Sequence, residues 1–205
     1  MDLSALKFAV FPLLVLAIAD RAAANESHYT DLDLNQCATL SEYDLGASFQ
    51  CTGYLDYPVY VSEGDLRQTV FFGHVKDDYQ KKGFESFSQF NYVGSKIEWR
   101  VDPAGKPVAA ILRWMIENPE GESEPATLGQ VLVISRVAQK KDGISCVAGY
   151  VDALANKDAN VIARQVADET APGFACAAAD PAWHGERGTS SGEPARQLPD
   201  SPPGK

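Results

Sequence analysis

The chain has 205 residues, 45% of them hydrophobic and 22% charged, which is typical of a folded globular protein and excludes a fibrous or wholly disordered one. Its 28 acidic residues outnumber its 18 basic ones and give a formal net charge of -10. Because nucleic-acid binding depends on clustered Lys and Arg, this charge argues against a nucleic-acid partner. It favours a cationic protein or a component of the cell envelope, although it can also serve solubility alone.

The first 24 residues have the pattern of a cleaved export signal. Lys7 precedes an unbroken apolar run at 8–19, which is shorter than the roughly 20 residues that span a bilayer. Small residues follow at two cleavage sites, and we favour the cut after Ala24. No later segment is apolar enough to span, so we expect a periplasmic or secreted protein with no membrane span after signal cleavage.

Four cysteines in an exported chain favour two disulfides over a metal or redox role. Their spacing contains no C-x-x-C, so the common zinc and thioredoxin signatures are absent. Of the three possible pairings we expect Cys37 with Cys51 and Cys146 with Cys176, because each pair closes a short loop.

Alternating apolar and polar residues predict a mostly antiparallel sheet. The clearest hairpin joins strands at 96–101 and 108–116 through the turn residues 103–106. We expect its apolar side chains to share one face and Glu98 to pair diagonally with Arg113 on the polar face. The expected register pairs are Val101 with Val108, Trp99 with Ala110 and Ile97 with Leu112.

Further strands are expected at 58–62, 67–73, 130–137 and 144–151. The run 131–134 is apolar on both faces, which indicates a central strand that is covered twice. A helix at 158–171, with Asp158 as its N-cap, is the candidate element to pack on the second face of this strand. These elements predict one α+β domain at 25–178, with a mostly antiparallel sheet, a C-terminal helix packed on one face and two disulfides. The segment 179–205 is rich in Gly, Pro and Ser and is expected to be a disordered tail.

Three patterns suggest chemistry, and each has a simpler explanation. Residues 188–192 match G-x-S-x-G but lie in the expected tail, away from any strand-to-helix turn. His74 stands near Asp77 and Asp78, but no second His lies close in the sequence. A calcium-loop spacing lacks the Gly that makes its sharp turn, and comprises Asp31, Asp33, Asn35 and Glu42. The sequence therefore indicates no catalytic residue, metal site or cofactor.

The segment 53–67 concentrates aromatic, acidic and turn residues, which recognition surfaces commonly combine. The same residues can instead form a strand entry and a hairpin turn, and both explanations stay open. The candidate binding residues are Tyr54, Asp56, Tyr57, Tyr60, Glu63, Asp65 and Arg67.

A series of short segments resembles a family of uncharacterised exported bacterial proteins. The resemblance covers about 35 to 176 and implies a location in the bacterial envelope or outside the cell. It carries no activity, cofactor or catalytic residue. The segments are Cys37, 51–54 (CTGY), 58–61 (PVYV), 64–67 (GDLR), 97–100 (IEWR), 111–114 (ILRW), 129–133 (GQVLV) and 150–156 (YVDALAN).

The sequence therefore favours an exported acidic protein that acts as a non-catalytic binding or envelope-accessory module. The alternative is a carboxylate-dependent hydrolase acting on envelope or extracellular polysaccharide, because glycosidic cleavage needs only two acids across a cleft. The candidate acids are Asp56, Glu63, Asp65 and Glu98.

Overall fold

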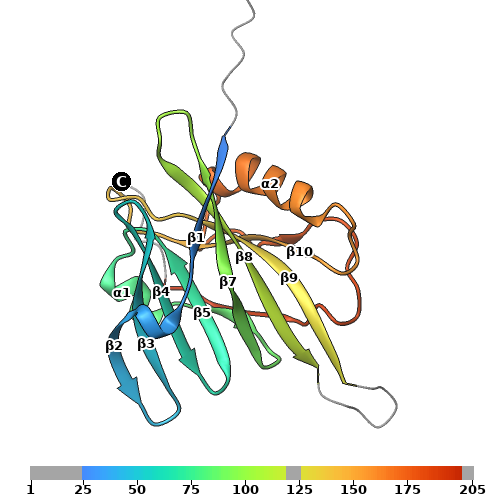
Figure 1. Ribbon diagram of the computed structural model, residues 1–205, viewed down its shortest axis with the longest axis horizontal. Helices are drawn as coiled ribbons and strands as arrows, with labels where there is room; N and C mark the ends of the chain where they lie inside the picture. The colour runs from blue at the N-terminus through green and yellow to red at the C-terminus, as the bar shows by residue number, and fades with distance from the viewer. Residues whose placement is uncertain (1–24, 119–125, 200–205) are drawn as a thin grey trace, which may run out of the picture.

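The structure, a computed structural model, describes residues 25–118 and 126–199. The predicted export signal at 1–24 lies outside the described residues. A six-stranded sheet and a four-stranded sheet dominate the fold, as Figure 1 shows. The large sheet has the order β1-β7-β8-β9-β10-β11, with β1 (Glu26–Asp31), β7 (Asn91–Val101), β8 (Pro107–Asn118), β9 (Thr127–Arg136), β10 (Cys146–Asp152) and β11 (Ala182–Trp183).

The small sheet is an antiparallel meander in chain order. Its strands are β2 (Ala38–Tyr43), β3 (Gly46–Tyr54), β4 (Tyr57–Gly64) and β5 (Arg67–Phe72). A 3-10 turn at Leu34–Gln36 leads from β1 into β2. A separate two-stranded ribbon pairs β6 (Phe84–Phe87) with β12 (Pro194–Gln197).

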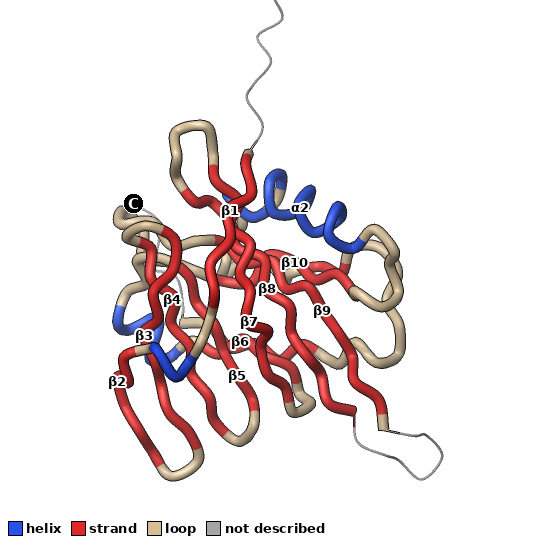
Figure 2. Tube along the Cα trace, viewed as in Figure 1, coloured by secondary structure: helices blue, strands red, loops and turns tan. Residues whose placement is uncertain are grey.

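The molecule has three layers, with the large sheet in the middle. One face of the large sheet packs on the small sheet, where Trp99 and Leu112 meet Val59 and Phe72 in the main core. The opposite face packs on the helix α2 (Ala159–Glu169) through Ile134 and its neighbours. Figures 1 and 2 show α2 and the small sheet on opposite sides of the large sheet. Two covered faces explain why the apolar run 131–134 is buried throughout.

The predicted hairpin forms between β7 and β8. Two of its expected register pairs are confirmed, Ile97 with Leu112 and Trp99 with Ala110. The third is wrong, because a register shift between Arg100 and Val101 sets Val101 opposite Pro107. Such a bulge adds a residue to one strand and increases the local twist.

The helix α2 falls within the predicted range and lies against the large sheet. Its buried side is made of small residues and one Val, namely Ala159, Ala163, Val166 and Ala167. Asp158 occupies the N-cap position as expected, although its side chain makes no capping hydrogen bond.

Both predicted disulfides are confirmed, Cys37 with Cys51 and Cys146 with Cys176. The fold is mostly antiparallel with a C-terminal helix, as expected, but strands far outweigh helices, so the α+β class holds only loosely. A short helix, α1 (Asp77–Lys82), was not predicted.

The prediction of a disordered tail is wrong for 179–199. Strand β11 pairs with β10 in parallel, and β12 pairs antiparallel with β6. Ser191, in the loop between them, is 1% exposed. Polar contacts hold this segment: Arg196 bonds to Glu85, and the backbone N–H of Gly188 donates to Asp152. Residues 200–205 lie outside the described part of the chain.

Candidate functional site

The face of the small sheet that turns away from the large sheet carries a groove of about 550 Å³. Tyr60 on β4 lies directly between Gln50 on β3 and Phe71 on β5 in the strand register. Two register pairs further along, on the same face, Ser48 lies opposite Ser62. Phe71 is buried and forms part of the floor. The groove is therefore a polar and aromatic strip that crosses three strands.

Period-two alternation along the strands separates this strip from the core. On β4, Val59 and Val61 are buried against the large sheet, whereas Tyr60 between them is half-buried and faces the groove. On β3, Gln50 is exposed beside the buried Cys51. Successive side chains of a strand point to opposite faces, so the core packing of one set presents the other set to the groove.

Helix α1 forms one wall of the groove. Tyr79 anchors the helix by packing edge-on against Phe71, with ring centroids 5.8 Å apart. Asp77, Gln80 and Lys81 then line the groove. Acids in the first turn and lysines in the last turn complement the dipole of this short helix.

Strand β2 forms the opposite rim and is exposed along its whole length. Its Ser41 hydroxyl lies 2.7 Å from that of Ser48, and the Tyr43 hydroxyl donates to the backbone carbonyl of Glu63 at 2.7 Å. Within the described residues, these are the side-chain hydrogen bonds made by the groove lining. The side chains of Gln50, Tyr60, Ser62 and Gln80 form none there.

The electrostatics of the groove are close to neutral. Its lining holds one carboxylate, Asp77, and one ammonium, Lys81, in a protein of net charge -10. Desolvation raises the pKa of the Tyr60 hydroxyl, and the nearby Asp77 carboxylate adds to that rise. Tyr60 therefore keeps its proton at neutral pH and can both donate and accept a hydrogen bond.

The structure does not bring the seven predicted binding residues together. Tyr60 alone among them lines the groove. Tyr54, Asp56 and Tyr57 lie at the β3–β4 turn, where Tyr54 stacks near Trp99 with centroids 6.3 Å apart. Tyr57 donates a hydrogen bond to Gln139 at 3.0 Å.

The other three predicted residues lie at the opposite end of the same strands. Glu63 accepts a hydrogen bond from Gln68 at 2.6 Å, and Asp65 pairs with Arg67 at 2.6 Å. Arg67 also stacks over the Phe90 ring, 5.0 Å from its centroid. These contacts agree with the alternative that the segment forms strand ends and hairpin turns.

The candidate acids of the hydrolase alternative are all bonded to other side chains, and Asp56 lies far from Glu63 and Asp65. Asp56 immediately precedes β4 and Glu63 is near its far end, so at about 3.3 Å per residue the extended strand places them over roughly 20 Å apart. Glycosidase carboxylates stand only about 5–10 Å apart. Asp56 bonds to Lys140 at 2.6 Å, whereas Glu98 lies on the large sheet beside α2.

The expected pair between Glu98 and Arg113 is wrong. Glu98 instead accepts a hydrogen bond from Arg164 on α2 at 2.6 Å, and Arg113 donates to Gln130. Arg100, which is 7% exposed, pairs with Asp168 on the same helix at 2.6 Å. These bonds attach α2 to β7. The charged residues on the α2 side of β7 therefore have a structural role.

The three chemical patterns do not form sites. The imidazole of His74 lies 3.6 Å from the Asp56 carboxylate and packs at a tilt against the Tyr57 ring, while Asp78 pairs with Lys82. Ser190 of the G-x-S-x-G match donates to Thr127 and lies in a loop between strands. No three His, Cys, Asp or Glu side chains of 25–118 and 126–199 gather in a metal-binding arrangement.

The sequence reasoning missed most of the groove. Ser48, Gln50, Ser62 and Gln80 were not singled out, although the first three alternate with apolar residues along β3 and β4. That alternation is a signal for one exposed sheet face. It does not tell which exposed face becomes concave, because the α1 wall was not predicted.

This chain matches no protein-family model, no curated protein and no solved structure. Its resemblance to exported bacterial proteins therefore stays a prediction. None of the helices in the described ranges has the length and apolar character needed to cross a membrane.

Proposed function

We propose that the protein is an exported, non-catalytic binding module that holds a neutral, hydroxyl-rich ligand, a glycan chain, in the groove of the small sheet. The observation that carries this proposal is the set of hydrogen-bonding side chains that flank Tyr60 and form no bonds to other described residues. A groove of about 550 Å³ falls within the usual range of roughly 300–1,000 Å³ for small-molecule sites.

The chemistry of the lining supports a sugar. The amide groups of Gln50 and Gln80 offer both donors and acceptors, as do the hydroxyls of Tyr60 and Ser62. The C–H face of a sugar ring can pack on an aromatic ring while its hydroxyl groups bond to such a rim. The balance of Asp77 against Lys81 favours a neutral ligand over a strongly charged one.

Pairing of the acids supports a binding role over a catalytic one. Each acid proposed for hydrolysis already has a partner: Lys140 for Asp56, Gln68 for Glu63, Arg67 for Asp65 and Arg164 for Glu98. Export is supported by the predicted signal and is compatible with the two disulfides, which persist in oxidising compartments.

Affinity electrophoresis tests the binding role. The protein is run through gels that contain a neutral polysaccharide, an anionic polysaccharide or none. We expect retardation by the neutral polysaccharide and a loss of about tenfold in affinity for Tyr60→Ala or Gln50→Ala. Tyr92→Ala is the matched control, because Tyr92 is exposed and lies outside the groove. Equal retardation of all variants would contradict the assignment of the groove.

The same polysaccharides test the hydrolase alternative. After long incubation with the wild-type protein we expect no new reducing ends. Release of reducing ends that disappears in both Glu63→Gln and Glu98→Gln would overturn the non-catalytic proposal. If the wild-type protein and both variants released the same reducing ends, hydrolysis would occur without either acid.

A further inference from the structure

A second surface lies where the strand turns meet at one end of the molecule, the lower end in Figure 1. Backbone hydrogen bonds link successive segments there. The N–H of Asp65 donates to Leu45 O, that of Asn91 to Leu66 O, and that of Glu117 to Phe90 O. We call this surface the turn end and define it by its exposed apolar residues Leu45, Leu66, Phe90, Tyr92 and Leu128.

The five side chains that define the turn end are all exposed to solvent. Leu45 is 74% exposed and Leu66 is 60% exposed, and the three others are 40–44% exposed. Single exposed apolar residues are ordinary on soluble proteins, but a group of them commonly marks an interaction site. Leu128 lies at the same end of the large sheet, opposite Glu117 in the strand register, and alternation places both side chains on the α2 side of that sheet.

The turn that presents Leu66 is strained. Asp65 has φ 51° and Leu66 has φ 59°, so both central residues of this two-residue hairpin loop lie in the left-handed region. Gly or Asn is the usual residue there, because a branched side chain in that region costs energy. An exposed Leu at such a position fits selection for contact better than selection for stability.

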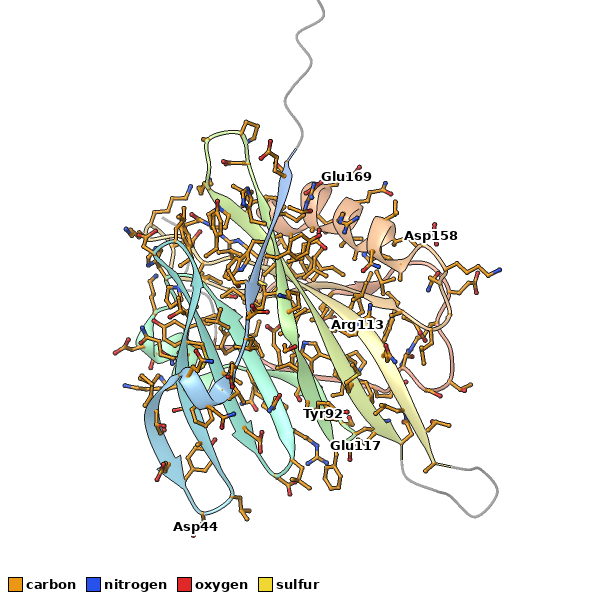
Figure 3. All side chains as sticks on the ribbon, in the orientation of Figure 1. Asp44, Tyr92, Arg113, Glu117, Asp158 and Glu169 are labelled. Atoms are coloured by element: carbon orange, nitrogen blue, oxygen red, sulfur yellow. A yellow bond between two sulfur atoms is a disulfide. The ribbon has the colours of Figure 1, made fainter. Side chains whose placement is uncertain are left out.

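The charges around the turn end are mostly negative. Asp44, Glu63, Asp65 and Glu117 belong to its segments, and the cation among the described residues of these segments, Arg67, is paired with Asp65. The adjoining loop, which contacts Gln89 and Thr127, adds Arg187, and Arg187 is paired with Glu193. Figure 3 places Asp44 and Glu117 at this end, with Tyr92 beside Glu117.

We propose that the turn end is a docking surface for a basic protein or peptide segment that presents apolar side chains between its cations. The apolar residues supply the contact area, and the acids select the sign of the partner. A second copy of this chain would place acids against acids, and an anionic lipid surface would be repelled. This surface is separate from the groove, so either proposal can fail alone.

Fluorescence anisotropy with three short labelled peptides tests the docking surface, using the protein in its exported form at low ionic strength. One peptide alternates Lys with Leu, one alternates Lys with Ser, and one alternates Glu with Leu. We expect the Lys–Leu peptide to bind at least tenfold more tightly than either of the others. We also expect its affinity to fall as salt is added, because exposed charges are screened.

Variants locate the binding. Leu45→Ser and Leu66→Ser should each weaken Lys–Leu binding about tenfold. Leu154→Ser should not, because Leu154 is 59% exposed but lies outside the turn end. Asp44→Lys combined with Glu117→Lys should weaken binding further, whereas Glu169→Lys on α2 should have little effect. Tyr60→Ala, which tests the groove, should leave peptide binding unchanged.

Several outcomes would overturn the docking proposal. Equal binding of the Lys–Leu and Lys–Ser peptides would show that binding is non-specific charge attraction, with no contribution from the apolar residues. Sedimentation that shows a concentration-dependent dimer, lost in Leu45→Ser, would replace the basic partner with a second copy. Binding to phosphatidylglycerol vesicles without peptide binding would replace it with a membrane. Unchanged melting temperatures would confirm that the variants remain folded.

Discussion

The guanidinium of Arg196 on β12 donates a 2.7 Å hydrogen bond to the carboxylate of Glu85 on β6, which is 2% exposed. The same guanidinium donates to the backbone carbonyls of Ala179 and Cys176. A second oxygen of Glu85 accepts the backbone N–H of Val147 on β10. One buried ion pair thus joins the C-terminal segment, the β6 ribbon and the large sheet.

Removal of Arg196 should leave the buried carboxylate of Glu85 without its positively charged partner. We expect Arg196→Met to lower the free energy of unfolding by about 3–5 kcal/mol at pH 8, where Glu85 is ionised. The loss should be smaller at pH 5, where Glu85 can take up a proton. Urea denaturation at both pH values measures the difference. Arg187→Met is the control, because Arg187 pairs with the exposed Glu193 and should cost under about 1 kcal/mol. A pH-independent loss would contradict the ion-pair explanation.

The stability of the wild-type protein should fall as pH rises from about 4.5 to about 7. Burial raises the pKa of Glu85 to about 7, and the Arg196 guanidinium only partly opposes that rise. The folded state therefore holds the proton more tightly than the unfolded chain. This contribution is fully present below the unfolded pKa and is lost as pH rises through the folded one, up to about 3 kcal/mol in total.

Glu85→Gln should flatten this dependence, because the variant has no proton to lose at that position. Urea denaturation of both proteins between pH 4 and pH 8 provides the comparison. If the two curves kept the same slope across this interval, the titrating group would have to be another residue.

The two disulfides should differ in what they protect. In the chain-entropy model, loss of Cys146–Cys176, which spans 30 residues, costs about 4 kcal/mol, and loss of Cys37–Cys51, which spans 14, costs about 3 kcal/mol. Arg196 bonds to the carbonyl of Cys176, so replacing both Cys146 and Cys176 with Ala should also expose 179–199 to protease. Replacing both Cys37 and Cys51 with Ala should leave that segment protected. Equal cleavage of both variants would contradict this anchoring role.

Relief of strain at the turn end should separate stability from binding. Leu66→Gly should raise the free energy of unfolding by about 0.5–1 kcal/mol, because glycine adopts positive φ without steric cost. It should also weaken binding of the Lys–Leu peptide. Leu55→Gly is a matched control, since Leu55 has φ 51° and is 72% exposed at the opposite end of β4. That variant should gain stability and keep its binding, and parallel losses of binding in both would refute the role of Leu66.

Local pattern was enough to predict much of the fold. The pairs Ile97 with Leu112 and Trp99 with Ala110 follow from alternation around one turn. The bulge that moves Val101 to Pro107 carried no sequence signal that we could use. Helix α2 and both disulfides were also predictable, because their patterns lie within short stretches of chain.

The groove was less predictable than the strands that form it. Alternation on β3 and β4 indicates which residues share a face, but Gln50 and Tyr60 become a site only because the opposite face is buried and α1 rises beside them. The seven residues chosen for their unusual composition were split along β4, because an extended strand carries its two ends far apart.

The sequence by itself determined the net charge and predicted an export signal, and it indicated the strand periods and the close cysteine pairs, because these patterns depend on residues near one another in the chain. Tertiary structure alone decided that the polar segment 179–199 is ordered. Arg196 and Glu85 are 111 residues apart, and the carboxylate of Asp152 meets the backbone of Gly188 across 36 residues. Such bonds order a segment that has too few apolar residues to bury, and composition, which records what one segment contains, holds no information on a distant partner.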